Sequence, residues 1–390
     1  MSWFQTFQMS QSINIVGAGI SGSLIAYFLR NTFKIKPTIP IKIFDKSRGV
    51  GGRLSTSRLN NDQNKTIAKV DLGAQQYSFN SFQELSAEQQ TIINLWKDND
   101  LLENISTDRI INAPSQYRSK INYQAKTGNS NLVKILLEKS DNIEKILNKK
   151  VDFNDIANEM DAEWVFTVPA AQFGEIFTEN LERNETFSDS KFSDILALLE
   201  NVQYSVRYCL GLALNKVPES LKNNAVYENS SKTSNIRYLS NKKIDEDLPT
   251  ESLCIHSSVP FALNIKDTKT KEEGGQILLE EFIKNYPEAE IESVKHHRWL
   301  YSQVYRSPVS GENFLTHGNI TVTGDCFAKT ANVLGCIDAA FKTAEAIATK
   351  LEKYMWILLQ ILTLEFESRN IKSSAFSGQI IYPFNRKFNK

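Results

Sequence analysis

The strongest constraint on the fold is a glycine-rich turn that joins an apolar run to a helical pattern near the start of the chain. The apolar run at residues 13–16 leads directly into three glycines with the spacing G-x-G-x-x-G, which are Gly17, Gly19 and Gly22. In such a turn the first glycine permits a tight bend, the second lets a pyrophosphate approach the backbone, and the third lets helix and strand pack closely. The N–H groups at the start of the helix, around Ser21, can bind phosphate.

A second apolar run, at residues 41–44, extends this signature and ends at Asp45. The acidic residue follows the glycines by about twenty positions, the spacing at which a carboxylate can accept hydrogen bonds from ribose hydroxyls. A strand, a glycine turn, a helix and this acid together predict a dinucleotide site, which the glycines alone would not.

A third motif, at residues 46–56, distinguishes between the possible dinucleotides. It contains Gly52 followed by Arg53 and resembles the Gly-Gly-Arg motif of the flavin-containing amine oxidase superfamily. The glycines let the backbone approach a cofactor, and a guanidinium can neutralise a pyrophosphate with two parallel hydrogen bonds. We therefore predict FAD rather than NAD as the cofactor.

The composition argues against several other classes of protein. The 390 residues include 45 basic and 45 acidic ones, so we expect two domains and neither nucleic-acid binding nor a membrane partner. Four cysteines and four histidines without zinc-type spacing predict reduced thiols and no metal site. Residues 1–10 lack the basic and apolar regions of a signal peptide, which favours a cytoplasmic location and leaves secretion open.

The alternation of helical and strand patterns predicts an α/β fold with a discontinuous cofactor domain. Further strands are expected near residues 151–156, 164–169, 204–214, 252–259 and 319–325, and helices near residues 128–137, capped by Ser130 or Asn131, and 336–351. The predicted segments are 12–78, 127–172 and 317–352 for the cofactor domain, 79–126 and 173–316 for a substrate domain, and 353–390 for a C-terminal extension.

Residues 354–364, within this extension, are strongly apolar. They are too few to span a bilayer as a helix, which needs roughly 20 residues. We expect them to extend the preceding helix, with a membrane or partner anchor as the alternative.

Several other segments resemble the renalases, flavoproteins of the amine oxidase superfamily. They occur in family order and comprise residues 70–75, 204–212, 236–238, 255–261, 299, 301–304, 323–325 and 335–337. The combination of residues 71–75 with 256–260 distinguishes this family from its relatives. The resemblance implies a Rossmann-like FAD-binding domain of the hydroxybenzoate-hydroxylase type. It also implies a second, α+β substrate domain, built on a mixed sheet that covers the flavin.

The resemblance also implies an activity. Renalase-like enzymes oxidise the 1,2- and 1,6-dihydro isomers of NAD(P)H to NAD(P)+ by hydride transfer to flavin N5. Dioxygen then takes the electrons and becomes hydrogen peroxide. Such a transfer needs a stacked donor ring but no catalytic acid or base. The expected partners are therefore a dihydronicotinamide dinucleotide and dioxygen, with FAD bound non-covalently.

The same resemblance implies roles for individual residues. Asp325 is expected to hold a ribityl hydroxyl, and the helix start at Gly335 is expected to direct its positive end at the flavin. The expected cofactor contacts are Gly17, Gly19, Ser21, Gly22, Asp45, Gly52, Arg53, Gln75, Val151, Gly324, Asp325, Gly335, Cys336 and Ile337. Candidates for the substrate pocket are Gln75, Gln76, His256, Trp299 and Tyr301.

These pocket candidates have competing interpretations. A neutral amide at Gln75 or Gln76 suits recognition of a nicotinamide carboxamide. A structural role inside the sheet or core stays open for His256, Trp299 and Tyr301.

The chain departs from the family pattern at the substrate end. The hairpin at residues 159–165 is short, Leu300 stands where the pattern has arginine, and the extension has no counterpart. Two other functions therefore stay open. One is a flavin-dependent amine oxidase, although neither Cys326 nor Cys336 lies in the Ser-Gly-Gly-Cys context of covalent flavin attachment. The other is a non-enzymatic signalling or binding protein built on a flavin fold.

Overall fold

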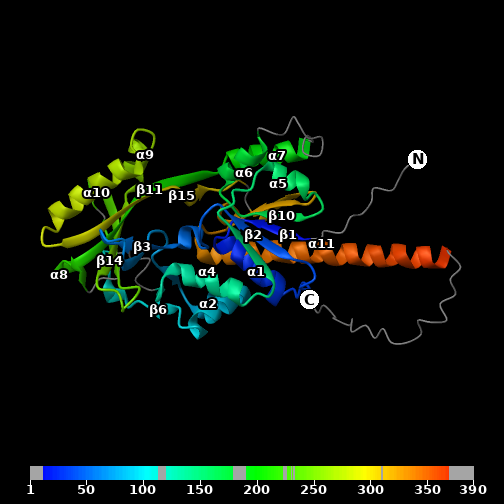
Figure 1. The fold of residues 1–390 in the computed structure, drawn as a ribbon, viewed down its shortest axis with the longest axis horizontal. Helices are drawn as coiled ribbons and strands as arrows, with labels where there is room; N and C mark the ends of the chain where they lie inside the picture. Colours follow the sequence, from blue (N-terminus) through cyan, green and yellow to red (C-terminus); the bar gives the residue numbers. More distant parts are fainter. Residues whose placement is uncertain are drawn as a thin grey trace.

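The computed structural model describes residues 12–112, 120–178, 190–222, 226–229, 231, 233–308 and 311–368. Within these residues, two six-stranded sheets account for most of the strands. Figure 1 shows one sheet near the middle of the molecule and the other towards its left end, with a long helix extending to the right.

The first sheet contains the predicted nucleotide-binding strands. It consists of β1 (Ile13–Val16), β2 (Ile41–Asp45), β9 (Ile143–Leu147), β10 (Glu163–Phe166), β16 (Phe314–His317) and β17 (Ile320–Thr323). Its order is β16-β17-β10-β1-β2-β9, and all neighbours are parallel except β16 and β17. β1 and β10 are buried along their whole length, as expected for parallel strands covered on both faces.

Helices supply that cover. One layer consists of α1 (Ile20–Asn31), α2 (Ala87–Asp98), α4 (Asn129–Glu138) and α11 (Val333–Ser368). Their apolar side chains form one core with Ile13 and Ile15 of β1. The opposite layer consists of α5 (Phe153–Asn158), α6 (Ala170–Phe177) and α7 (Ser190–Glu200). This layer belongs to a second core that contains Trp164 and Phe166 of β10.

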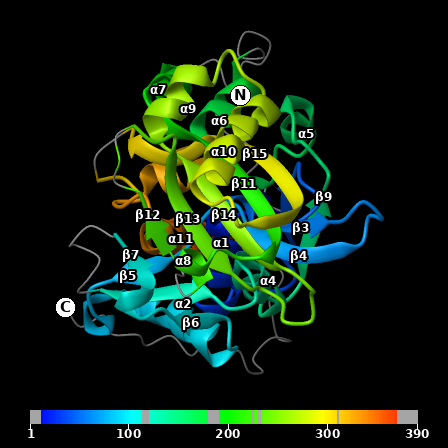
Figure 2. The same cartoon turned by 90° about the vertical axis from the view of Figure 1, so that its left-hand side faces the viewer.

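The second sheet is mixed and carries the long strands. It consists of β7 (Ile110–Ile111), β11 (Gln203–Lys216), β12 (Val226–Glu228), β13 (Ile236–Lys242), β14 (Glu251–Ser257) and β15 (Glu290–Arg306). Its order is β15-β11-β14-β13-β12-β7, with only β12 and β7 parallel. Its outer face packs against α8 (Glu219–Lys222), α9 (Val259–Ile265) and α10 (Lys271–Asn285) (Figure 2).

The inner face of the second sheet packs on a hairpin formed by β3 (Thr56–Asn60) and β4 (Thr66–Asp71). A Cβ at Gly211 of β11 would lie 2.7 Å from a methyl carbon of Val70, so the glycine permits this close approach. Asp71 also joins the two parts, because its carboxylate binds Lys242 of β13 at 3.0 Å and accepts a hydrogen bond from the Asn129 N–H at 3.0 Å.

A small three-stranded sheet lies beside α2. It consists of β5 (Tyr77–Phe79), β8 (Ile121–Ala125) and β6 (Leu102–Asn104), in the order β5-β8-β6. Tyr77 and Trp96 of α2 pack in the same core as α1 and α4. The segment between β4 and β5 therefore joins the hairpin to this small sheet.

The two large sheets draw on different parts of the chain. β1, β2, β9, β10 and β17 fall within the three segments predicted for the cofactor domain, and the second sheet falls within those predicted for the substrate domain. β16 spans the proposed boundary at residue 317 and pairs with β17 in the first sheet. The domain limits themselves stay a prediction.

The predicted strand at residues 151–156 is wrong, because the chain turns there into α5. The Asp152 side chain accepts hydrogen bonds from two N–H groups of the first turn, and the Asp155 side chain accepts one from the Asp152 N–H at 2.9 Å. This reciprocal capping starts a helix although the apolar residues suggest a strand.

The predicted caps of α4 are also wrong. α4 follows Gly128, which has a φ of 93° and no side-chain cap. A Cβ at Gly128 would lie 2.6 Å from the hydroxyl of Thr56, so the neighbouring hairpin requires glycine there. Ser130 instead accepts a hydrogen bond from the Thr56 N–H at 2.7 Å, and Asn131 donates to the Thr127 carbonyl at 3.0 Å.

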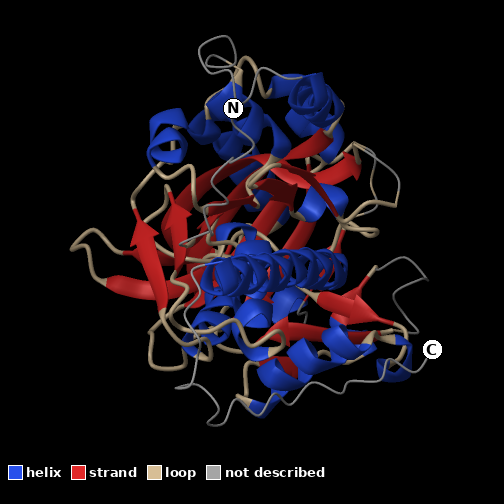
Figure 3. Cartoon of the chain, turned by 90° about the vertical axis from the view of Figure 1, so that its right-hand side faces the viewer, coloured by secondary structure: helices blue, strands red, loops and turns tan. Residues whose placement is uncertain are grey.

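The last helix continues through the apolar segment at residues 354–364. α11 includes residues 354–364 and ends at Ser368, so the apolar segment extends the helix as expected. Figure 1 shows this end beyond the two sheets, and in Figure 3 the helix points towards the viewer. None of the helices in the described residues is long and apolar enough to cross a membrane. Residues 369–390 of the predicted extension lie outside the described part of the chain.

Candidate functional site

A cavity of about 1230 Å³ lies at the carboxyl ends of β1 and β2. Its wall includes Gly17 and Gly19 after β1 and Asp45 at the end of β2. In open parallel sheets the loops at the carboxyl ends of the strands form the ligand crevice. The nucleotide signature therefore lies where such a ligand binds.

The three glycines of the turn differ in what surrounds them. Gly17 has a φ of 114°, which favours glycine. A Cβ at Gly22 would lie 2.1 Å from the carbonyl oxygen of Gly17, so strand and helix touch there. A Cβ at Gly19 would meet no atom closer than the Gly51 carbonyl oxygen at 3.9 Å. Gly19 thus leaves open space beside the backbone, as a bound pyrophosphate would require.

Asp45 holds the glycine turn in place from the second strand. Its two carboxylate oxygens accept hydrogen bonds from the N–H groups of Ala18 at 2.9 Å and Ser47 at 2.7 Å. A carboxylate has about four acceptor positions, so both oxygens can also accept from a ribose hydroxyl. The Gly51 N–H donates to the Ala18 carbonyl at 2.8 Å, which joins the Gly-Gly-Arg turn to the first turn.

The arginine of the Gly-Gly-Arg turn forms an ion pair with Asp325, which follows β17. Arg53 lies in a short 3-10 helix, η1 (Gly52–Leu54), and Asp325 begins another, η6 (Asp325–Phe327). Arg53 Nη1 binds Asp325 Oδ2 at 2.6 Å inside the cavity. Burial by itself would lower the pKa of Arg53, but the Asp325 carboxylate outweighs burial and raises it. Arg53 is therefore a fixed cation at this wall.

The start of α11 forms the next part of the wall. The helix begins at Val333, before the predicted range of residues 336–351, and the Asn332 side chain accepts a hydrogen bond from the Gly335 N–H at 2.9 Å. Cys336 lines the cavity, and burial raises the pKa of its thiol to about 12. Ile337 is fully buried in the core of the first sheet instead.

The predicted cofactor contacts thus separate into two groups. Those that line the cavity are Gly17, Gly19, Ser21, Asp45, Gly52, Arg53, Val151, Asp325 and Cys336. Gly22, Gly324, Gly335 and Ile337 lie behind this wall, and Gln75 lines a different cavity.

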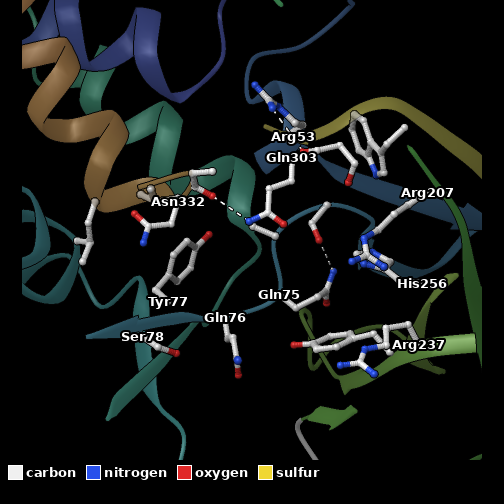
Figure 4. Close-up of a pocket in the computed structure, with 18 of the residues that line it drawn as sticks. Arg53, Gln75, Gln76, Tyr77, Ser78, Arg207, Arg237, His256, Gln303 and Asn332 are labelled. Atoms are coloured by element: carbon white, nitrogen blue, oxygen red, sulfur yellow. Dashed lines mark hydrogen bonds between the residues drawn. The ribbon is translucent and has the colours of Figure 1, made fainter. Parts of the chain in front are cut away.

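A second cavity, of about 390 Å³, adjoins the first. The two share the wall residues Arg53, Trp299, Ser302, Gln303, Ala331, Asn332 and Val333. Figure 4 shows Gln303 and Asn332 of this shared wall together with the predicted pocket residues Gln75, Gln76 and His256. The structure therefore brings a dinucleotide-sized cavity and a smaller pocket together.

The two glutamines of the smaller cavity differ in their hydrogen bonding. Gln75 Nε2 donates to the carbonyls of Asp71 at 2.6 Å and Gly73 at 3.0 Å, which fixes the amide against its own segment. Gln76 Oε1 is buried and accepts no hydrogen bond from the described residues. A buried acceptor without a donor carries an energetic cost that a ligand N–H would relieve.

His256 and Trp299 share one structural partner. His256 Nε2 lies 2.9 Å from the Leu72 carbonyl oxygen, and Trp299 Nε1 donates to the same oxygen at 2.8 Å. Burial first, and the Arg207 charge second, lower the pKa of His256 to about 3. The ring is therefore neutral near pH 7. Both side chains line the pocket while they tie the residue that follows β4 to the second sheet.

Tyr301 does not line the smaller cavity. It borders the larger one, where its ring packs edge to face against Tyr204 at a centroid distance of 5.3 Å. Among the described residues, no group of His, Cys, Asp and Glu could hold a metal ion.

The smaller cavity contains two arginines that the sequence analysis did not select. Arg207 on β11 and Arg237 on β13 both line it. Each interrupts an otherwise apolar or aromatic strand pattern, and a charged residue there is the signal that could have identified them. The two arginines were not predicted as site residues because their spacing matches no motif.

Comparison with known proteins supports this description of the fold. Residues 15–87 match the family described as NAD(P)-binding Rossmann-like domain. No curated protein matches the sequence.

Solved structures match over most of the chain. One is a provisionally named protoporphyrinogen oxidase from Exiguobacterium sp. 255-15, at 12% identity and a TM-score of 0.54, covering 88% of this chain and 100% of that one. An oxidoreductase from Methanosarcina mazei has 12% identity and a TM-score of 0.51, with 86% and 100% covered. Cyclohexylamine oxidase from Brevibacterium oxydans IH-35A has 11% identity and a TM-score of 0.59, with 88% and 100% covered.

At these identities the likeness concerns the fold alone. The predicted fold class, a Rossmann-like nucleotide-binding domain with a second part built on a mixed sheet, is confirmed. The chain shares its fold with these three solved structures.

Proposed function

We propose that this chain is an FAD-dependent oxidoreductase of the renalase type. In this proposal it oxidises 1,2- and 1,6-dihydro isomers of NAD(P)H. Dihydronicotinamide, dioxygen and one proton give NAD(P)+ and hydrogen peroxide, so the substrate loses two electrons and dioxygen gains them. FAD, when bound, supplies the two-electron acceptor.

The observation that carries the proposal is the shared wall of the two cavities. The larger cavity has the glycine turn, the open space beside Gly19 and the acid Asp45 that a dinucleotide needs. Gly17, Gly19, Asp45, Arg53 and their neighbours on that wall would hold the FAD. The smaller cavity meets it at Gln303 and the start of α11, where a substrate ring would lie beside the cofactor.

The lining of the smaller cavity suits a substrate that needs no proton removed from it. Among the described residues, it contains no Asp, Glu or Lys, and its histidine is neutral with a pKa of about 3. A general base has to titrate near the working pH to be effective, and His256 does not. The buried Gln76 Oε1 offers an acceptor for a carboxamide N–H.

The test is an anaerobic mixture of the purified yellow protein with 1,2- or 1,6-dihydro-NAD, followed by absorbance of the flavin. We expect rapid bleaching and, on admission of air, formation of peroxide that catalase removes. Ordinary 1,4-dihydro-NAD, which carries the same charges, is the control for isomer specificity.

Two results would contradict the proposal in different ways. Bleaching by monoamines but not by dihydro-NAD would establish the amine oxidase alternative. A stable, colourless protein that takes up no FAD would instead support the non-enzymatic alternative.

A further inference from the structure

We propose that Arg58 and Lys295 bind the phosphates of the substrate dinucleotide, in the part of the larger cavity that lies between β3 and β15. This part, the β3–β15 groove, is lined by Arg58, Asn60, Lys295 and His297. The inference rests on the proposed function, because it takes the substrate ring to lie at the boundary of the two cavities. It adds a second point of attachment: the ring binds beside the flavin, and the phosphates bind further along β15.

Strand pairing places three side chains of β15 in a row on the inner face of the second sheet. Lys295, His297 and Trp299 alternate along a stretch that pairs with β11 in regular register, so they share one face. Lys295 pairs with Gly211, which lies against the β3–β4 hairpin, so this face is the inner one. All three side chains line the larger cavity.

β3 supplies the opposite side of the groove. Ser293 Oγ donates to the Asn60 carbonyl at 2.7 Å, and Lys295 Nζ donates to the Arg58 carbonyl at 3.5 Å, so the two strands lie side by side. The Arg58 side chain is exposed, whereas Lys295 is half-buried. A guanidinium matches phosphate oxygens with two parallel hydrogen bonds, and an ammonium binds them as a point charge. The two cations can therefore contact one anion from different sides.

The order of side chains along β15 matches the order of parts in a dinucleotide. Trp299 borders both cavities, so a substrate ring at their boundary lies near it. His297 is next, and its Nε2 is buried without a hydrogen-bond partner among the described residues. A ribose hydroxyl can satisfy it. Lys295 lies roughly 13 Å along the strand from Trp299, which leaves room for a ribose between the ring and the phosphates.

The acids of the larger cavity are bonded outside the groove. Three acids line this cavity, and each has a partner elsewhere in its wall: Asp45, Glu175 and Asp325. Within the described part of the chain, neither Arg58 nor Lys295 takes part in an ion pair. Two neighbouring cations without an acid beside them attract an anion.

The charges around Lys295 are also positive. Burial first, and then the charges of Arg48 and Lys271, lower the pKa of Lys295. Burial, Lys271 and Lys295 lower the pKa of His297 to about 4, so its ring is neutral near pH 7. His297 therefore suits a hydroxyl, and a phosphate at Lys295 would offset the repulsion among the cations.

The experiment measures binding of ADP-ribose to the FAD-loaded protein by calorimetry. ADP-ribose has the two phosphates of the substrate dinucleotide but no nicotinamide ring, so its binding requires no reaction. We expect Lys295→Gln and Arg58→Gln each to weaken its binding about tenfold, because each removes one charged contact. Lys295→Arg and Arg58→Lys keep the charge and should recover most of the affinity. Flavin content should stay unchanged in all four variants, because the proposed FAD site lies at the glycine turn.

Lys216→Gln and Arg306→Gln are the matched controls. Both residues are exposed on long strands of the same sheet, and neither lines either cavity. The controls remove the same charges and should leave the affinity for ADP-ribose unchanged.

ADP-ribose 2′-phosphate distinguishes the two sources of phosphate in such a substrate. A larger loss for this ligand than for ADP-ribose in the groove variants would identify the 2′-phosphate of an NADP isomer. Equal losses for the two ligands would identify the pyrophosphate that NAD and NADP share. Both results support the site.

The phosphate site and the proposed function fail separately. Three results would overturn the site even if dihydro-NAD is oxidised: unchanged affinity for ADP-ribose in both groove variants, an equal loss in the controls, or loss of FAD together with ADP-ribose. Loss of ADP-ribose binding in the groove variants alone, with no oxidation of dihydro-NAD by the wild type, would overturn the proposed function and leave the site in place.

Discussion

The two adjoining cavities are built from different parts of the polypeptide. The nucleotide end of the larger one is mostly main chain, contributed by Gly17, Gly19, Gly51 and Gly52 within one short stretch of sequence. The smaller one is mostly side chains, collected from segments between Arg53 and Leu334. A backbone wall depends on the absence of side chains, and a side-chain wall depends on which ones are present.

The two cavities should therefore respond differently to substitutions in their walls. One added methyl group can close a backbone wall, because no rotamer can move it aside. A side-chain wall accepts many substitutions without loss of fold, but each one changes the charge or shape that a ligand meets. The first cavity should therefore fail by losing its cofactor or its fold, and the second by changing its ligand.

The largest expected effect is that of Gly22→Ala. Its methyl group would lie 2.1 Å from the Gly17 carbonyl oxygen and 3.0 Å from a carbon of Ile15, both in the packed strand. We expect a loss of about 3 kcal/mol in the free energy of unfolding, measured by urea denaturation. A variant as stable as wild type would show that strand and helix are not in contact there.

Gly19→Ala adds the same methyl group in the same turn and should act only on the cofactor. Gly19 has a φ of −79°, which alanine adopts freely, and its Cβ would project into open space. We expect stability within about 0.5 kcal/mol of wild type and at least a tenfold weaker affinity for FAD. Titration of the apoprotein with FAD measures the affinity. Normal flavin loading would contradict the assignment of the pyrophosphate to Gly19.

Asp325→Ala tests a part of the larger cavity whose wall consists of side chains. It removes the partner of Arg53 and the carboxylate expected to hold a ribityl hydroxyl. A hydrogen bond to a charged group is worth about 1.5–3 kcal/mol, so FAD should bind roughly tenfold to a hundredfold more weakly. Asp325→Asn keeps an acceptor and should lose less. Unchanged flavin retention in both variants would remove Asp325 from the site.

The smallest expected effect is a pH dependence in the second cavity. The pKa of His256 is about 3 in the folded protein, lowered by burial and by Arg207, against about 6.5 when unfolded. Between these values the unfolded chain binds a proton that the folded chain does not, so stability falls as the pH falls. His256→Gln should reduce the loss between pH 7 and 5.5 by roughly 1 kcal/mol. Denaturation midpoints of wild type and His256→Gln at both pH values measure this difference. If the two proteins lost the same stability between pH 7 and 5.5, His256 would titrate normally when folded.

The sequence could predict the features that depend on local spacing. The strand, the glycines and Asp45 lie within one continuous stretch, and each needs only its neighbours to take its conformation. The same reasoning was wrong at residues 151–156, where the apolar pattern suggests a strand but Asp152 and Asp155 cap a helix. Short apolar runs fit either structure, and the cap decides between them.

The pocket candidates show where such reasoning stops. His256 and Trp299 line the smaller cavity, but their shared bond to the Leu72 carbonyl joins residues more than 180 positions apart. Tyr301 was placed in the substrate pocket and lies at the larger cavity. Arg207 and Arg237 were missed because the pairing of separate strands, with an irregularity at Arg237, brings them to one pocket, and no spacing in the sequence reveals it.

The sequence by itself determined that this chain builds a dinucleotide cradle, because a G-x-G-x-x-G turn between a strand and a helix leaves backbone N–H groups and open space wherever it folds. Only the tertiary structure decided what lies beside that cradle. The pairing of β11, β14 and β13 set two arginines next to a neutral histidine, and the start of α11 closed the wall between the cavities. Charge at a site depends on distances through space, and the pairing of strands far apart in the chain fixes those distances.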